Sequence, residues 1–481
     1  MGITKGSVIS SLVWKFMERI GAQTVQFLVQ IILARLLLPE DFGIIVIVII
    51  FINIASVFVQ QGFSTALIQK TDTDNTDYST VFYINLVVAS SMYICLYIAA
   101  PYIAEVFRQD LLTQVLRVVS ITLLLGAVIS IQTSYLIKRM EFKKQFISTL
   151  LATVISGIVS VVMAYKGFGV WALVTQQMLS QVIIIFVLSF VVKWRPALIF
   201  SKSRAISLFS YGWKLLISSL IDVLYNNSRS IIIGKMYDAS TLAYYNRGEQ
   251  FPSLLVTNIN GSIQSVIFPT LVAYKEDIQK VKSIVRRAVT LSSFFVFPIM
   301  TGLAATAEPI IKILLGNNWL LAVPFIRIAC SYFIFWPIHT ANLQAINAIG
   351  RSDIFLKLEI LKKSLGIIVL ICTIPFGIYA IALGLVLISL ISIFINAWPS
   401  RKLFNYKYSE QFKDLFPSFI AAILMGGIVY SLNFFESDIF LILVSQIFVG
   451  IVMYILLAMI FRDPSYFYLK SIIYKKIKRD K

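Results

Sequence analysis

Residues 42–68 read FGIIVIVIIFINIASVFVQQGFSTALI and contain no charged side chain. A helix needs about 20 apolar residues to cross the hydrocarbon core of a bilayer, which is roughly 30 Å thick. The stretch therefore predicts a membrane-spanning helix. The rest of the chain has the same character, because 58% of its 481 residues are hydrophobic and only 14% are charged. Such a composition leaves too little polar surface to cover a water-soluble globule.

Apolar stretches of similar length recur along the whole sequence and predict an all-α polytopic membrane protein with about fourteen transmembrane helices. The first stretch carries Lys15, Glu18 and Arg19 and lacks a small-residue cleavage pattern, so no cleaved signal peptide is expected. The three cysteines lie inside apolar stretches, so no disulfide, metal site or cofactor is predicted. The fourteen stretches are residues 9–37, 42–68, 78–104, 111–137, 146–165, 169–192, 208–236, 248–273, 284–306, 319–349, 354–375, 378–400, 414–432 and 438–461.

The basic residues gather in alternate connections between these stretches. If the N-terminus is cytoplasmic, 28 of the 42 lysines and arginines lie on the cytoplasmic side and nine lie within or at the ends of spans. The positive-inside rule then places both termini in the cytoplasm. Despite a formal charge of +19, the basic tail is expected to contact anionic lipid headgroups and not nucleic acid. The five outer residues are Arg108, Lys166, Lys235, Arg247 and Lys312.

The first and seventh predicted spans resemble each other. Trp14-Lys15 and Trp213-Lys214 each open a span at its cytoplasmic end, and the offset of 199 residues places Gln30 on Arg229. At about 100° per residue, each helix carries one polar stripe. Because both spans begin on the same side, the sequence predicts two parallel six-helix lobes around a central cavity. The alternative is that two amphipathic starts share Trp-Lys by chance.

This repeat predicts the domain organisation of the chain. The two six-helix lobes are expected at residues 1–200 and 201–402. Two extra transmembrane helices follow at 403–461, and a basic cytoplasmic tail occupies 462–481. The connection from residue 193 to residue 207 is the expected position of a hinge between the lobes.

Charged residues inside the predicted spans are the strongest functional signal. A lysine or arginine at the centre of a span costs about 2.5–3.5 kcal/mol even on lenient scales, so it usually faces protein or a wet cavity. Structural ion pairs, such as Asp222 with Arg229, are one interpretation. Bases outnumber acids there, however, and a positive cavity suits an anionic substrate, because arginine binds phosphate bidentately. The candidate substrate-binding cations are Lys15, Arg19, Lys214, Arg229 and Arg327, and the candidate ion-coupling acids are Glu18, Asp222 and Glu249.

Three further motifs favour structural interpretations over chemical ones. Asp72-Thr73-Asp74 resembles a glycosyltransferase metal clamp but lies in a short loop without a nucleotide fold. Residues 167–172 match a dinucleotide fingerprint but lie between two spans, where a tight interhelical turn is expected. His339 is the only histidine, and its span also holds several amides, which favours a packing role over proton transport.

Together, a set of collinear motifs resembles the Wzx and teichuronic-acid class of polysaccharide flippases, in the multidrug/oligosaccharidyl-lipid/polysaccharide exporter superfamily. The resemblance covers roughly the first 400 residues. The Asp often found in this family near the middle of the seventh span is not clearly present, because Asn227-Ser228-Arg229 occupies that stretch. The motifs are Leu33-Ala34-Arg35-Leu36-Leu37-Leu38-Pro39-Glu40-Asp41-Phe42-Gly43, Gly62 to Lys70, Lys138 to Phe142, Gly167 to Leu173, Arg195-Pro196, Ile233-Gly234-Lys235, Leu242 to Arg247, Phe268-Pro269 and Gly316 to Trp319.

This resemblance implies the cargo and the location of the protein. The expected substrate is an oligosaccharide repeat unit on undecaprenyl pyrophosphate, moved across the bacterial cytoplasmic membrane for surface polysaccharide synthesis. The resemblance also implies that cations of the first helix line the cavity, for which Arg19 is a better match than Arg35. Glycosyltransferases and a polysaccharide polymerase are the expected protein partners.

Three functions remain open at this point. The first is a lipid-linked oligosaccharide flippase that works by alternating access, makes or breaks no bond and is driven by a proton or sodium gradient. The second is an ion-coupled drug antiporter of the same fold, although organic cations would favour an acidic cavity. The third is a membrane polysaccharide polymerase or transferase, although such enzymes tend to have a large outer loop or an acid- or histidine-based site.

Overall fold

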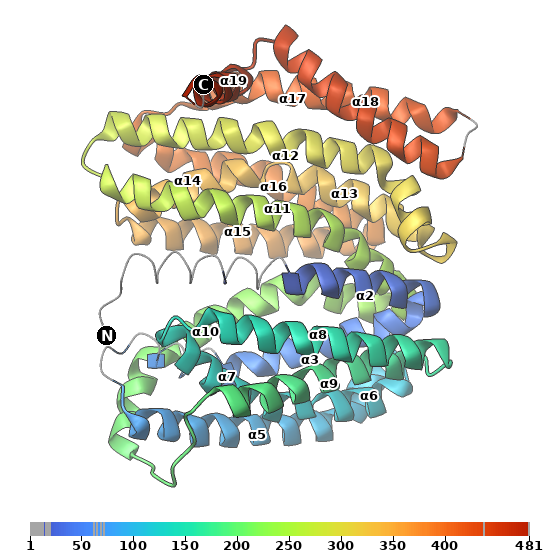
Figure 1. Ribbon diagram of the computed structural model, residues 1–481, viewed down its shortest axis with the longest axis vertical. Coiled ribbons are helices and arrows are strands. Elements are labelled where there is room, and N and C mark those ends of the chain that lie inside the picture. Colours follow the sequence, from blue (N-terminus) through green and yellow to red (C-terminus); the bar gives the residue numbers. More distant parts are fainter. Residues whose placement is uncertain are drawn as a thin grey trace. The chain divides into compact units, whose positions relative to one another are not determined.

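The computed structural model describes residues 14, 21–60, 63, 66–67, 70, 73–435 and 438–479. Within these residues the secondary structure is helical, without a strand (Figure 1). The chain divides into two compact units, an N-terminal unit of residues 1–243 and a C-terminal unit of residues 244–481. The all-α membrane fold predicted from hydropathy is thereby confirmed.

The N-terminal unit is built around α3, which contacts α5, α6, α7, α9 and α10. The sequence explains this central position, because α3 is among the most hydrophobic of the described helices and half of its residues are buried. A helix that is apolar all round is suited to a position inside a membrane bundle. The helices of this unit are α2 (Gln23–Leu36), α3 (Pro39–Gln60), α5 (Asn75–Phe107), α6 (Leu111–Val119), α7 (Ile121–Lys138), α8 (Phe142–Tyr165), α9 (Val170–Val191) and α10 (Lys202–Met236).

The C-terminal unit has α12 at its centre, in contact with α13, α14, α16, α17, α18 and α19. Helix α11 begins in the last residues of the N-terminal unit and continues into this one. The elements are α11 (Ala239–Ala273), α12 (Ile278–Leu314), the 3₁₀ helix η2 (Asn317–Ala322), α13 (Val323–Phe333), α14 (Trp336–Ala348), α15 (Ser352–Thr373), η3 (Ile374–Phe376), α16 (Ile378–Phe404), α17 (Tyr408–Ser431), η4 (Leu432–Phe434), α18 (Ile439–Ile460) and α19 (Pro464–Arg479).

Within the described residues, each predicted span corresponds to one helix or to a short series of helices. Among the described residues, ten helical segments are long and apolar enough to cross a membrane, or eleven if the two parts of α10, bent by 50°, form one span. The other stretches correspond to α2, α11 and α15. The protein is therefore a multi-pass membrane protein, and the count of fourteen spans stays a prediction. The tail predicted after residue 462 contains a further helix, α19.

The connection between α9 and α10, where the sequence predicts a hinge, is attached to the start of α5. Trp194 donates from Nε1 to Asn75 Oδ1 at 2.7 Å, and the backbone N–H of Ala197 donates to Ser79 Oγ at 3.0 Å. The indole also packs in a buried cluster with Tyr78. The connection is thus held to the N-terminal unit by polar and apolar contacts along its length.

Two motifs that are distant in sequence meet at the start of α3. The Asp41 carboxylate accepts a hydrogen bond from the backbone N–H of Leu38 at 3.2 Å and another from that of Val170, the first residue of α9. Gly167 and Gly169 form the tight turn before α9 with φ angles of +82° and +55°, a region that favours glycine. The structure therefore confirms that residues 167–172 form an interhelical turn, and it shows that Asp41 caps the helix that follows.

Candidate functional site

The polar face of α10 carries three of the predicted site residues, and the structure places them in different environments. Lys214 is exposed, and its ammonium lies 6.0 Å from the centre of the Trp213 ring. Asp222 is half-buried, and its side chain is not free of contacts. Arg229 is buried, with only 4% of its surface exposed. The three residues lie on the same helix, but only Arg229 is buried.

Arg229 is the unusual member of this face, because part of its guanidinium is buried without a hydrogen-bond partner. Its Nε and Nη2 atoms have none, and the group lies 5.7 Å from the Tyr225 ring. A cation–π contact of this kind supplies part of the lost hydration, but it satisfies no N–H donor. The described residues contain no ion pair between Arg229 and Asp222. Arg229 is therefore a buried cation with donors available to an anion.

The predicted site residues of the C-terminal unit have structural partners. Arg327 donates from Nε to the carbonyl of Ala304 at 3.3 Å, and its guanidinium lies 5.3 Å from the Tyr430 ring. Glu249 accepts a hydrogen bond from the Tyr332 hydroxyl. Both interactions fix helices of this unit to one another. The remaining three candidates, Lys15, Glu18 and Arg19, lie outside the described residues.

Sequence reasoning assigned Arg247 to an outer loop, whereas the structure buries it in α11. Its exposed fraction is 8%, its Nη1 donates to Gln250 Oε1 at 2.6 Å, and its guanidinium lies 5.3 Å from the buried Trp319 ring. Hydropathy did not place Arg247 in a helix, because α11 begins at Ala239, before the apolar stretch of residues 248–273. The short motifs around Arg247 and Trp319 thus meet in the fold.

His339 lies in a hydrogen-bonded polar layer between α14 and α16. Its Nε2 lies 3.2 Å from Ser389 Oγ and its Nδ1 lies 3.2 Å from Asn396 Nδ2. Between the same two helices, Ser400 donates to Asn342 Oδ1 at 2.6 Å. Both ring nitrogens therefore have partners, as expected of a packing histidine.

The loop with the Asp-x-Asp motif is used for helix capping. Asp74 accepts from the backbone N–H of Asp77 at 2.9 Å in a reciprocal capping box that starts α5. That backbone bond and the Arg204 guanidinium lower the pKa of the Asp74 carboxyl from its usual value. The buried Asp77 carboxylate forms ion pairs with Lys70 at 2.8 Å and Arg204 at 3.2 Å. The structure thus assigns Asp74 of the motif to protein contacts, whereas Asp72 lies outside the described residues.

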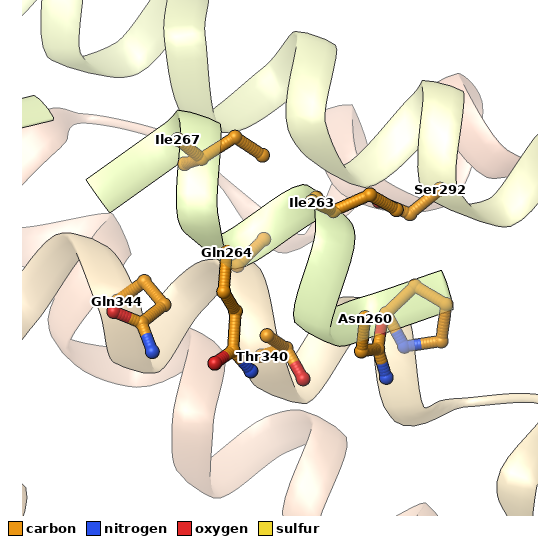
Figure 2. A pocket seen from close by; sticks show the side chains of 9 residues that line it. Asn260, Ile263, Gln264, Ile267, Ser292, Thr340 and Gln344 are labelled. Carbon is orange, nitrogen blue, oxygen red and sulfur yellow. The ribbon is translucent and has the colours of Figure 1, made fainter. Parts of the chain in front are cut away.

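A narrow uncharged pocket lies between α11, α12 and α14 (Figure 2), and its free volume of about 10 Å³ for the centre of a water-sized group is room for about one hydroxyl or one water. Sequence reasoning missed it, because no charge marks it. The only signal is spacing, since 260, 263, 264 and 267 on α11 and 337, 340, 341 and 344 on α14 each follow the i, i+3, i+4, i+7 pattern of one helix face. Its lining residues are Asn260, Ile263, Gln264, Ile267, Ser292, Pro337, Thr340, Ala341 and Gln344.

An apolar groove of about 1250 Å³, counting its open side, runs between α12, α17 and α18. Two of its polar side chains donate within the protein: Gln446 Nε2 donates to the carbonyl of Val429 at 3.1 Å, and the Tyr454 hydroxyl donates to the carbonyl of Phe294 at 2.8 Å. Gln446 Oε1 has no hydrogen-bond partner. The rest of the lining is mainly hydrocarbon, which suits an acyl or isoprenoid chain.

Comparison with known proteins agrees with this fold. The chain is 24% identical to the succinoglycan biosynthesis transport protein ExoT of Rhizobium meliloti, over 69% of this chain and 68% of that protein. It is also 24% identical to the teichuronic acid biosynthesis protein TuaB of Bacillus subtilis, over 79% of each chain. Its fold is similar to that of the lipid II flippase MurJ in an inward closed conformation, with a TM-score of 0.74 and 17% identity over 95% of this chain and 99% of that one.

The family assignment follows from residues 32–324, which match the polysaccharide biosynthesis protein family. The matched region contains most of the motifs on which the sequence resemblance depended, from Leu33 to Trp319. It ends before the helices that form the apolar groove with α12. The resemblance predicted from those motifs is confirmed, and the chain belongs to the polysaccharide biosynthesis protein family.

Proposed function

We propose that this protein is a flippase that moves lipid-linked oligosaccharide repeat units across the cytoplasmic membrane for surface polysaccharide synthesis. The observation that carries the proposal is Arg229, a buried arginine with unpartnered donors in a membrane helix of a polysaccharide biosynthesis protein. Leaving a buried donor without a partner costs about 1–3 kcal/mol, and more for a charged group. A substrate anion would recover that cost.

The chemistry of an undecaprenyl-pyrophosphate-linked sugar matches the surfaces of the protein. The pyrophosphate is the part that the bilayer core excludes most strongly, and a guanidinium can bind it with two parallel hydrogen bonds. The apolar groove between α12, α17 and α18 would cover part of the isoprenoid chain. Lys15, Arg19 and Lys214 are expected to contribute further positive charge. In this account Arg327 stabilises the C-terminal unit and contributes only to the electrostatic field.

Transport makes and breaks no bond. The expected mechanism is alternating access, in which one lobe moves against the other around the bound substrate. Both termini are assigned to the cytoplasm of a bacterial cell, on the distribution of basic loops. Coupling to a proton or sodium gradient would use Asp222, Glu249 or Glu18. Glycosyltransferases would supply the substrate, and a polymerase would consume it on the outer face.

A deletion strain tests this proposal. Without the protein, polymer should disappear from the cell surface, and polyprenyl-pyrophosphate-linked repeat units should accumulate in the cytoplasmic leaflet. Extraction of the lipids and mass spectrometry of their glycans measure the accumulation, and a plasmid copy of the gene should reverse it. Loss of polymer without any accumulated lipid-linked glycan would instead indicate a role before the carrier is loaded. Unchanged polymer with increased sensitivity to cationic drugs would support an antiporter.

A further inference from the structure

We propose that the uncharged pocket between α11, α12 and α14 receives a hydroxyl group from a neutral sugar of the transported repeat unit, with Asn260 as its principal contact. The proposal rests on the flippase function and adds to it a second recognition site, in the C-terminal unit, for the sugar. The site is chemically different from the polar face of α10, which carries Lys214 and Arg229, because none of the residues that line the pocket is charged.

The geometry of the pocket follows from two facing helix surfaces. Asn260 and Gln264 are one turn apart on α11, and Thr340 and Gln344 are one turn apart on α14. Figure 2 shows these four polar side chains around the pocket, with Ile263 and Ile267 beside them on α11. Amides and hydroxyls in a membrane helix face protein or a wet cavity, because lipid offers them no hydrogen bond. The two surfaces together therefore form a polar recess bordered by apolar side chains.

Asn260 identifies the chemistry of the occupant. The residue is 98% buried, and neither its Oδ1 nor its Nδ2 has a hydrogen-bond partner. One of these atoms accepts hydrogen bonds and the other donates them. A cation would engage only Oδ1 and an anion only Nδ2. A hydroxyl group both donates and accepts, so one hydroxyl can engage both Oδ1 and Nδ2.

The buried end and the mouth of the pocket differ in exposure. Asn260 and Thr340 are buried, whereas Gln264 and Gln344 are half-buried. Because the free volume admits about one hydroxyl group, a sugar can present a single hydroxyl toward Asn260 while the rest of the repeat unit stays outside, near the glutamines. A water molecule offers the same hydrogen-bonding chemistry as a sugar hydroxyl. The two sources differ in one respect: a water bound at Asn260 would not favour a sugar-bearing lipid over a sugar-free one.

A binding comparison separates these sources. The purified full-length protein in nanodiscs is titrated with sugar-free undecaprenyl pyrophosphate and with the lipid-linked repeat unit extracted from the deletion strain. The wild type should bind the sugar-bearing lipid more tightly by about tenfold, equivalent to about 1.4 kcal/mol. Asn260→Leu should abolish this preference and leave the affinity for the sugar-free lipid unchanged, because a site built to hydrogen-bond a hydroxyl loses its discrimination when the polar group is removed.

Two further variants make the comparison decisive. Asn258→Leu is the matched control, because Asn258 lies on the same helix but donates to the carbonyl of Leu254 in its own turn at 2.9 Å and does not line the pocket. It should keep the preference for the sugar-bearing lipid. Thr340→Val preserves shape while removing the hydroxyl, and it should weaken the preference. It also decides the question if Asn260→Leu does not fold.

The outcomes distinguish this proposal from the proposed function. Retention of the sugar preference in Asn260→Leu, or in Thr340→Val if that variant alone folds, would overturn the sugar site and leave water as the occupant, with the flippase function intact. If the wild type binds neither lipid more tightly than it binds phosphatidylglycerol, the flippase function and the sugar site both fail.

Discussion

Replacement of Arg229 by glutamine should abolish polymer export while leaving the protein in the membrane at its normal level. The guanidinium is buried, and its Nε and Nη2 have no partner, so removing it takes away an unsatisfied charge. A stabilising ion pair would behave in the opposite way, since loss of one partner leaves the other buried at a cost of about 3–5 kcal/mol. Arg229→Lys keeps the charge but loses the bidentate geometry, and it should retain part of the export.

The matched control for this experiment is Arg139→Gln. Arg139 also lies against a tyrosine, 4.2 Å from the Tyr135 ring, but it is exposed. Its loss should leave export unchanged. Surface polymer and membrane abundance are measured together in each strain. Normal export in Arg229→Gln at normal abundance would contradict a substrate-binding role, and loss of the protein would indicate a structural one. The polar stripe of the first span predicts the same export defect for Arg19→Ala.

Gly43→Ala should destabilise the N-terminal unit by about 3 kcal/mol or more, because a Cβ atom at this position would overlap the backbone at the start of α11. The added carbon would lie 1.9 Å from the carbonyl oxygen of Ala239 and 2.4 Å from its carbonyl carbon. Overpacking a core typically costs about 1–3 kcal/mol, and the upper end applies where no flexible side chain can move aside. The start of α3 would have to separate from that of α11.

Gly427→Ala is the control for this substitution. Gly427 is also inside a membrane helix, α17, but a Cβ atom there would have no neighbour within 4 Å. Its replacement should be neutral, or stabilising by about 0.5–1 kcal/mol through helix propensity. Thermal denaturation of the two purified variants in the same detergent measures the difference. Equal melting temperatures would contradict the close contact between Gly43 and Ala239.

Hydropathy predicted the helices well, because the length of an apolar run follows directly from the thickness of the bilayer. It could not show where a run is broken. Residues 111–137 form α6 and α7, and residues 319–349 form η2, α13 and α14. These breaks depend on local features such as the prolines in the first turns of α13 and α14. Residues 464–479 were predicted only as a basic tail, because a charged amphipathic helix has no apolar run.

The candidate site was predictable only where charge marked it. Arg229 stood out in the sequence because a cation in a span is costly, and the structure places it in a buried environment. Arg327 stood out for the same reason, yet its guanidinium is held by a carbonyl and a tyrosine ring. Asn260 gave no such signal, since asparagine is tolerated in membrane helices. Its unpaired amide depends on tertiary packing, which a single sequence does not reveal.

Transbilayer movement in reconstituted vesicles tests the flippase function most directly. Purified protein is incorporated into liposomes that contain the lipid-linked repeat unit carrying a fluorophore on its sugar, and a membrane-impermeant reductant quenches the outer leaflet. Without movement about half of the signal survives. The account predicts that vesicles with wild-type protein lose most of the protected half, whereas vesicles with Arg229→Gln keep it. Full protection with wild-type protein, under both imposed proton and sodium gradients, would contradict the central claim.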